Sequence, residues 1–195
     1  MIPAFLLVLI AVLYRVVMGP FVQLESASLA NFAPLAAIAL CSAAYFPAKY
    51  KFTVPLVLLF VSDIILNLHY GADLLSPLII SRYFGLIVIG LAGVALQNCA
   101  SIKTMLAASL AGSLLLYLIA NTFSWLSDPG YTENFAGFIQ AQTVGLPAYS
   151  STPTWMFLRN SMLGDLLFTS LFVFCVHYGR SPERARASCA VPRAA

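Results

Sequence analysis

Residues 154–174 read TWMFLRNSMLGDLLFTSLFVF, and this stretch decides how the rest of the chain must fold. It has the length and apolar content of a membrane-spanning helix, yet Arg159 lies near its start and Asp165 more than one turn further in. A carboxylate inside a spanning helix costs about 2.5 to 3.5 kcal/mol on insertion scales. Ser161, Asp165 and Thr169 recur every four residues and therefore share one face of the helix. We expect this polar face to point into the protein, away from lipid.

The composition indicates that the whole chain is an integral membrane protein. Of its 195 residues, 61% are hydrophobic and only 9% are charged, and the mean hydropathy is +0.91. Soluble domains carry about 25% charged residues, so a soluble fold is excluded. The net charge of +3 comes from basic residues at the ends of apolar runs, which is the pattern of membrane topology. We therefore expect membrane lipid as the surroundings of the chain and no nucleic acid among its partners.

The length leaves room for about six spans of about 20 residues each, joined by short loops. The sequence therefore predicts an all-α membrane bundle of about six transmembrane helices, with a single transmembrane domain at 1–178. A basic, disordered cytoplasmic tail follows at 179–195. Because the N-terminus lacks a basic region and a cleavage site, we interpret it as a retained span that ends where Gly19-Pro20 breaks the helix. The expected spans are residues 3–18, 32–46, 52–68, 78–96, 104–123 and 154–174.

A short extra helix is expected between the fifth and sixth spans, inside the long connection at residues 124–154. Phe135, Phe138 and Ile139 fall on one side of this segment. That pattern is typical of an amphipathic helix that lies in the membrane interface. We expect it to cover the mouth of the bundle.

Two spans carry surfaces that allow two interpretations. In the second span, Ala37 and Cys41 belong to a stripe of small residues, which lets helix backbones approach closely in lipid. This stripe fits packing within the chain or docking of a partner protein. In the fifth span a polar line recurs every four residues, and it fits helix packing and ligand contact equally well. Its members are Ser109, Ser113, Tyr117 and Asn121.

The charges sort to two sides when loops are assigned alternately. Seven of the ten basic residues fall on one side, so the positive-inside rule places both termini in the cytoplasm. Six of the seven acidic residues fall toward the other, outer side. The seven basic residues are Lys49, Lys51, Lys103, Arg180, Arg184, Arg186 and Arg193.

Charged residues from four different spans are thereby predicted to meet in the outer half of the membrane. Isolated charges there are expensive, so we expect them to converge and pair. Arg159 and Asp165 lie six residues apart and face different sides of their helix, so each needs a partner elsewhere. The cluster fits a polar pocket open to the outside or a set of ion pairs that only clamps the helices. The candidate substrate-binding residues are Arg15, Asn31, Asp63, Asn67, Arg82, Asn121, Arg159, Asn160 and Asp165.

The sequence offers no motif for a catalytic centre, a metal or another cofactor. The four cysteines, Cys41, Cys99, Cys175 and Cys189, have no zinc-site spacing and fit small packing residues. Neither H-E-x-x-H nor G-x-S-x-G occurs. His69 and Asp73 are four residues apart and could perform acid/base chemistry, but no nucleophile is adjacent to them. We therefore expect no enzymatic activity; a membrane-embedded enzyme and a scaffold without a ligand are the alternatives.

Several motifs resemble a bacterial domain-of-unknown-function family described as candidate transport proteins. The resemblance covers nearly the whole chain and is most specific in the Arg-Asn-x-x-x-Gly-Asp run of the last span. Length, helix number and the polar outer mouth are also similar to the substrate-binding S components of energy-coupling-factor transporters. The motifs are Asn31-Phe32-x-Pro34, Ala44-Tyr45-Phe46, Val54-Pro55, Ser62-Asp63, Arg159-Asn160 and Gly164-Asp165.

That resemblance implies a multi-pass protein of the bacterial cytoplasmic membrane that takes up a small molecule. It would bind a small polar or charged solute in an outward-facing pocket, and a transmembrane coupling subunit with ATPases would drive release inward. S components usually carry their small-residue docking motif on the first helix. Here the best match lies in the second span instead.

Overall fold

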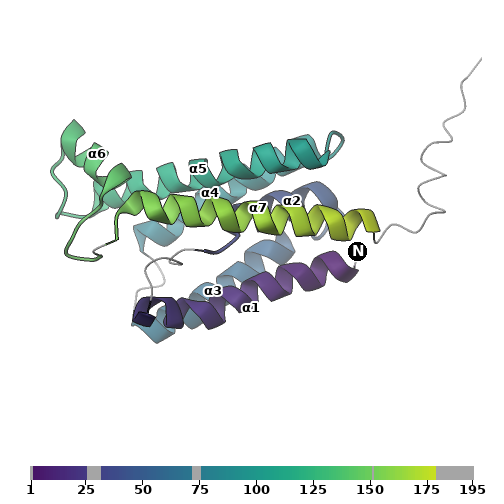
Figure 1. Cartoon of the computed structure of the whole chain (residues 1–195), viewed down its shortest axis with the longest axis horizontal. Helices are drawn as coiled ribbons and strands as arrows, with labels where there is room; N and C mark the ends of the chain where they lie inside the picture. Colours follow the sequence, from purple (N-terminus) through teal and green to yellow (C-terminus); the bar gives the residue numbers. More distant parts are fainter. Residues whose placement is uncertain (1, 26–31, 72–75, 151, 179–195) are drawn as a thin grey trace, which may run out of the picture.

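The computed structural model describes residues 2–25, 32–71, 76–150 and 152–178, and these residues form seven α-helices and no strand (Figure 1). The disordered tail predicted at 179–195 lies outside the described residues. The helices are α1 (Ile2–Glu25), α2 (Leu35–Tyr45), α3 (Thr53–Tyr70), α4 (Pro77–Leu96), α5 (Ile102–Ser127), α6 (Phe135–Thr143) and α7 (Thr154–Tyr178).

The helices form two groups that run along a common long axis. In Figure 1, α1 and α3 lie side by side below, while α2, α4, α5 and α7 form the upper group. The most extensive contact joins α2 to α4, and α2 also contacts α5 and α7. The buried core between the two groups includes Val8, Ile38, Leu59, Ile89 and Phe172. The site described below lies where these groups meet.

The helix α2 is the buried centre of the fold. It has only 11 residues, all but the last of which are buried, and a rise of 1.5 Å per residue makes it about 16 Å long. Gly93 on α4 lets the two backbones approach, because a Cβ atom there would lie 2.5 Å from the carbonyl oxygen of Leu40. Ala37 and Cys41 of the small-residue stripe have no exposed surface. These two residues of the stripe therefore pack within the chain.

Four helices, α3, α4, α5 and α7, are long and apolar enough to cross a membrane. The apolar part of α1 and the whole of α2 are shorter. Large apolar side chains are exposed along the bundle, as expected for helices that face lipid. This surface and the four long helices are compatible with a membrane protein. Examples of the exposed side chains are Leu13, Phe60, Ile80, Leu91 and Leu167.

The predicted spans match the observed helices within a few residues, except at the end of the first one. There the prediction that Gly19-Pro20 breaks the helix is wrong, because α1 continues to Glu25. A proline removes one backbone hydrogen bond and can bend a helix without ending it. The predicted helix end considered only the low helix propensity of glycine and proline.

The two ends of the bundle differ in their side chains. At the end where α1 begins, Nζ of Lys51 donates to Gln97, and the Tyr45 hydroxyl donates to the carbonyl oxygen of Ala100 at 3.1 Å. The loop that carries Lys49 and Lys51 therefore lies beside the connection that leads to Lys103 at the start of α5, as the alternating assignment of loops predicted. The opposite end carries α6 (Figure 1).

The short helix expected between the last two spans is present as α6. It begins after Asn134, whose Oδ1 accepts a hydrogen bond from the backbone N–H of Gly137 at 2.8 Å. Phe138 packs edge-to-face on Trp125 of α5, with ring centroids 5.5 Å apart. Phe135 and Ile139 remain exposed. The helix thus contacts the bundle through this aromatic pair and through hydrogen bonds of Gln142 to α5, and it leaves an apolar edge outside.

Candidate functional site

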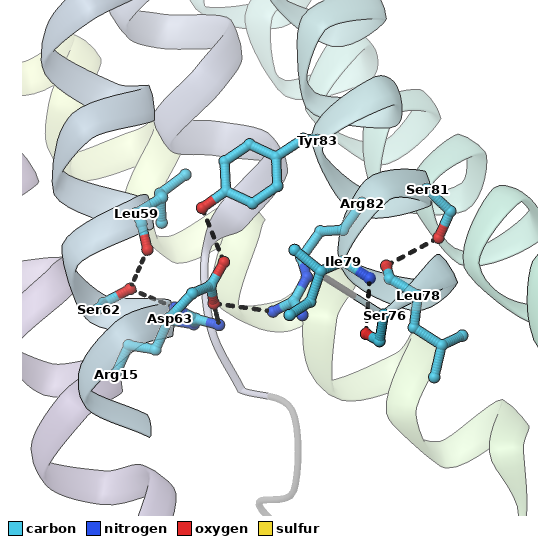
Figure 2. Close-up of polar contacts among 10 residues, drawn as sticks. All are labelled: Arg15, Leu59, Ser62, Asp63, Ser76, Leu78, Ile79, Ser81, Arg82 and Tyr83. Atoms are coloured by element: carbon cyan, nitrogen blue, oxygen red, sulfur yellow. Dashed lines mark hydrogen bonds and ion pairs between the residues drawn. The ribbon is translucent and has the colours of Figure 1, made fainter. Parts of the chain in front are cut away.

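Asp63 is the centre of a buried ion-pair cluster built from three helices. Its carboxylate on α3 lies between Arg15 of α1 and Arg82 of α4 (Figure 2). Oδ1 of Asp63 accepts from Nη2 of Arg15 at 2.5 Å and from Nη1 of Arg82 at 3.1 Å. Oδ2 accepts from the hydroxyl of Tyr83 at 2.8 Å. The predicted convergence of charges from separate spans is therefore confirmed for Arg15, Asp63 and Arg82.

Ser62 holds the first of these arginines in place. The Nη1 group of Arg15 donates to Oγ of Ser62, which in turn donates to the carbonyl oxygen of Leu59 at 2.7 Å (Figure 2). Arg15 thus has two acceptors on α3, whereas Arg82 has one. The side chain of Arg82 is also more exposed, at 26% against 11% for Arg15. Arg82 is the less constrained of the two cations.

Asp165 lies near the middle of α7 and satisfies its charge in a different way. It is 1% exposed, and its Oδ1 accepts a hydrogen bond from the backbone N–H of Ala37 at 2.8 Å. Its Oδ2 accepts from the hydroxyl of Ser113 on α5 at 2.6 Å. Pro34, which precedes α2, makes no side-chain capping bond. Asp165 therefore caps α2 from another helix, and its carboxyl group lies at the positive end of the helix dipole.

Hydroxyl groups continue this polar contact along α5 and α7. Oγ1 of Thr169 donates to Oγ of Ser109 at 2.9 Å, one turn beyond the contact of Ser113 with Asp165. Ser109, Ser113 and Thr169 are all at most 2% exposed. The first half of the polar line on α5 therefore packs α5 against α7. The second half, Tyr117 and Asn121, leads to a cavity.

The cavity has a volume of about 350 Å³ and lies between the two groups of helices. It is lined by residues of α1, α2, α4, α5 and α7, with the arginines of the Asp63 cluster and Asp165 among them. Its size is at the lower end of the range for small-molecule sites. The lining residues are Arg15, Leu35, Leu78, Arg82, Ser113, Leu116, Tyr117, Ala120, Asn121, Thr154, Phe157, Ser161 and Asp165.

The loop that carries α6 is tied to one wall of this cavity. The hydroxyl of Tyr117 donates to the carbonyl oxygen of Gln142 at 2.6 Å, which joins the cavity wall to the end of α6. In the same loop, burial raises the pKa of Tyr131, and a hydrogen bond to Asp128 raises the pKa of Tyr149. Both phenols therefore stay neutral at physiological pH. The loop contributes hydroxyl groups to this end of the molecule and no phenolate charge.

The predicted substrate-binding residues separate into three sets. Four of them, Arg15, Arg82, Asn121 and Asp165, line the cavity, and Asp63 holds the two arginines. Asn67, Arg159 and Asn160 are outside the lining, although Asn160 is almost fully buried. Asn31 lies outside the described residues. The sequence therefore predicted the charged residues that line the cavity.

Arg159 departs from the expected convergence. Its Nε and Nη2 atoms donate to Oδ1 of the neighbouring Asn160 at 3.2 and 3.1 Å. Its guanidinium group lies over the ring of Trp155, 6.0 Å from the centroid. Arg159 is thus satisfied within its own helix because a long side chain near a helix end can reach the surface. Asp165, in contrast, has its partners on other helices, as predicted.

Sequence reasoning missed Tyr83 and Ser62 as members of the cluster. Each is adjacent in sequence to a predicted charge, Arg82 or Asp63. Neighbouring residues on a helix face different directions, so spacing gave no signal that both would reach the same cluster. Thr154 and Phe157 in the cavity wall were missed for a similar reason, since only the packing of α7 against the other helices brings them there.

The residues considered for chemistry do not form a metal site in the described part of the chain. The structure contains there no group of three or more His, Cys, Asp or Glu side chains placed to hold a metal ion. Cys41, Cys99 and Cys175 are free thiols, while Cys189 lies outside the described residues. His69 is exposed at the end of α3 beside Tyr70, with ring centroids 5.2 Å apart. Its suggested partner Asp73 lies outside the described residues.

Comparison with known proteins gives one match. A model of a family of unknown function (DUF6580) matches residues 1–184. No curated protein and no solved structure matches the chain. The expected resemblance to a domain-of-unknown-function family is confirmed, and nothing in the comparisons links the chain to S components.

Proposed function

We propose, from the premise that the chain belongs to the DUF6580 family of unknown function, that it is a membrane transport protein that binds a small polar or charged solute. The binding site would be the 350 Å³ cavity between the α1–α3 pair and the other helices. The observation that supports this proposal is that Arg15, Arg82 and Asp165, on three different helices, line one hollow. Ionisable groups inside a membrane bundle commonly mark the path of a solute or ion.

A scaffold whose charges only clamp the helices is a weaker explanation of this arrangement. Clamping requires the contacts around Asp63 and Asp165 but no cavity beside them. The polar groups of Tyr117 and Asn121 and the apolar Leu116 reach this cavity from α5, and Phe157 reaches it from α7. A few polar groups in a largely apolar wall are typical of small-molecule sites.

The membrane arrangement that goes with this function has six crossings. We propose that α1, α3, α4, α5 and α7 cross fully and that the second crossing contains α2, which covers only about half of a 30 Å hydrocarbon core. The end that carries α6 would face the exterior, with α6 in the interface over the cavity, and both termini would lie in the cytoplasm of a bacterial inner membrane. Short helices that start within the membrane and point toward a site occur in transporters.

A coupling subunit with ATPases is the further partner that the resemblance to S components implies. Ala37 and Cys41 of the small-residue stripe of α2 are buried within the chain. If such a subunit binds, it must contact residues other than these two. Purification with and without candidate coupling subunits tests this separately from solute binding.

A binding assay on the purified protein in nanodiscs tests the proposed function. One compound from a panel of anionic, neutral and cationic metabolites should raise the unfolding temperature, because a ligand specific to the folded state stabilises it by about 2.7 kcal/mol at one hundred times its Kd. Ala120→Phe should abolish this effect by filling the cavity, since Ala120 is in its wall. Ala111→Phe is the matched control, because Ala111 is exposed on the same helix.

The result can contradict the proposal in two ways. Either no compound of any charge stabilises the protein, or a stabilising compound acts equally on Ala120→Phe and on the wild type. The first outcome favours a scaffold, and the second places the ligand outside the cavity.

A further inference from the structure

The charges around Asp63 do not balance. Two guanidinium groups, of Arg15 and Arg82, share one carboxylate, and the third partner, Tyr83, is a neutral donor. Among the described side chains, the cluster therefore has an excess of one positive charge. Both oxygens of Asp63 already accept hydrogen bonds. Arg82 thus shares Oδ1 of Asp63 with Arg15, while Oδ2 accepts from Tyr83.

Arg82 carries the unused hydrogen-bonding capacity. A guanidinium group has five N–H donors, but among the described residues only Asp63 accepts from Arg82, through Nη1. Its Nε and Nη2 groups have no acceptor in that part of the chain. Arg82 lines the cavity, and its side chain is 26% exposed. The cavity wall therefore offers donors from a cation that is only partly compensated.

Asp165 does not provide the missing negative charge. Its two oxygens are used by the N–H of Ala37 and the hydroxyl of Ser113, and no described Lys or Arg forms an ion pair with it. The helix terminus that it caps carries a partial positive charge of about half a unit, which opposes the charge of Asp165. The cavity therefore has a cationic wall at Arg82 and a carboxylate that is already engaged on the other side.

We propose that the cavity selects a small organic anion, with a carboxylate or phosphate group placed against Arg82 and a compact, largely apolar body beside Leu78, Leu116 and Phe157. This inference rests on the proposed function of the same cavity. The planar guanidinium fork matches carboxylate and phosphate groups with two parallel hydrogen bonds. The volume of 350 Å³ corresponds to about a dozen water molecules, which limits the ligand to a small molecule or to the head group of a lipid.

Three compounds of equal size and different charge test the sign of the preferred ligand. We would measure binding of benzoate, benzamide and benzylamine to the protein in nanodiscs of zwitterionic lipid, by thermal shift and titration calorimetry, with phenyl phosphate as a second anion. At least one anion should bind about tenfold or more tightly than benzamide, because a charge-assisted bidentate contact is stronger than a neutral one. Benzylamine should bind most weakly.

Arg82→Gln is the decisive variant. It should remove the preference for the anion over benzamide while the pair of Arg15 with Asp63 keeps the helices together, which circular dichroism and gel filtration would verify. Lys103→Gln removes a positive charge at an exposed position of α5 outside the cavity and should leave the preference unchanged. A preference that persists in Arg82→Gln would overturn the proposal.

The remaining outcomes separate this inference from the proposed function and identify the source of the anion. If benzamide or benzylamine binds best and Ala120→Phe abolishes that binding, the anion inference fails and the solute site remains. If no compound of any charge binds and anionic lipid has no effect, both fail. If phosphatidylglycerol in the nanodisc stabilises the wild type but not Arg82→Gln, while benzoate and phenyl phosphate do nothing, the anion is a lipid head group.

Discussion

Asp63 and Asp165 are both buried carboxylates in the middle of apolar helices, but the protein stabilises them by different means. Asp63 is 3% exposed and has two arginines and a tyrosine around it. Asp165 is 1% exposed and has a backbone N–H and a serine hydroxyl, with no ion pair among the described residues. One carboxylate is held by cations and the other by a helix terminus.

The difference between the two sites shows that a buried carboxyl group in an apolar helix can be satisfied by a helix terminus and a hydroxyl, without a charged side chain as its partner. The N-terminus of α2 offers unpaired N–H groups and the positive end of a dipole, and a carboxylate satisfies both. This explains why α2 can begin after Pro34 in the interior of the bundle. Among the described side chains, cations outnumber carboxylates at Asp63. Both of these cations, Arg15 and Arg82, line the cavity.

Removing the carboxylate of Asp63 should have the largest effect on stability. Asp63→Ala leaves two partly buried guanidinium groups without a counter-charge, so we expect a loss of about 3 kcal/mol or more in unfolding free energy. Replacing Arg15, Asp63 and Arg82 together by Met, Leu and Met should recover most of that loss, since no unpaired charge remains. Unfolding in mixed detergent micelles measures both. If Asp63→Ala cost less than 1 kcal/mol, the ion pairs would not hold the helices together.

Asp165 should respond to a different pair of substitutions. Asp165→Ala leaves the N–H of Ala37 without its acceptor and the hydroxyl of Ser113 with only the carbonyl oxygen of Ser109, which we expect to cost about 3 kcal/mol. Asp165→Asn keeps one acceptor oxygen for the helix terminus and loses mainly the dipole interaction, so about 1 kcal/mol is expected. The same micelle unfolding assay ranks the two variants. Equal losses would show that the charge matters here as much as the hydrogen bonds, which would remove the distinction from Asp63.

The neutral partners should give smaller effects than Asp63→Ala and Asp165→Ala. Tyr83→Phe removes one of three donors to Asp63, and Ser113→Ala removes one of the donors to Asp165. A single hydrogen bond to a charged group is worth about 1.5 to 3 kcal/mol, and loss of the serine should cost more because Asp165 has no cation to share the charge. Double-mutant cycles with Asp63→Asn and Asp165→Asn measure each coupling. A larger coupling for Tyr83 than for Ser113 would reverse this order.

The sequence predicted a large part of the site because the physics of burial is visible in it. Charged residues within apolar runs need polar partners, and Arg15, Asp63 and Arg82 are partners of one another. The sequence did not predict which charged residues join the cluster where a side chain had more than one partner within reach. Arg159 reaches Asn160 and Trp155 on its own helix, and nothing in the spacing distinguishes that from a turn inward.

The chain order and apolar content alone determined that the protein is helical, that its long helices are apolar enough for a membrane, and that its acidic residues inside them need partners. These follow from the cost of placing polar groups in hydrocarbon, which depends on local composition. Only the tertiary structure decided that α2 is a half-length helix buried among α4, α5 and α7, and that Asp165 caps it. That pairing joins residues 128 positions apart, and it depends on how whole helices pack, which no local pattern encodes.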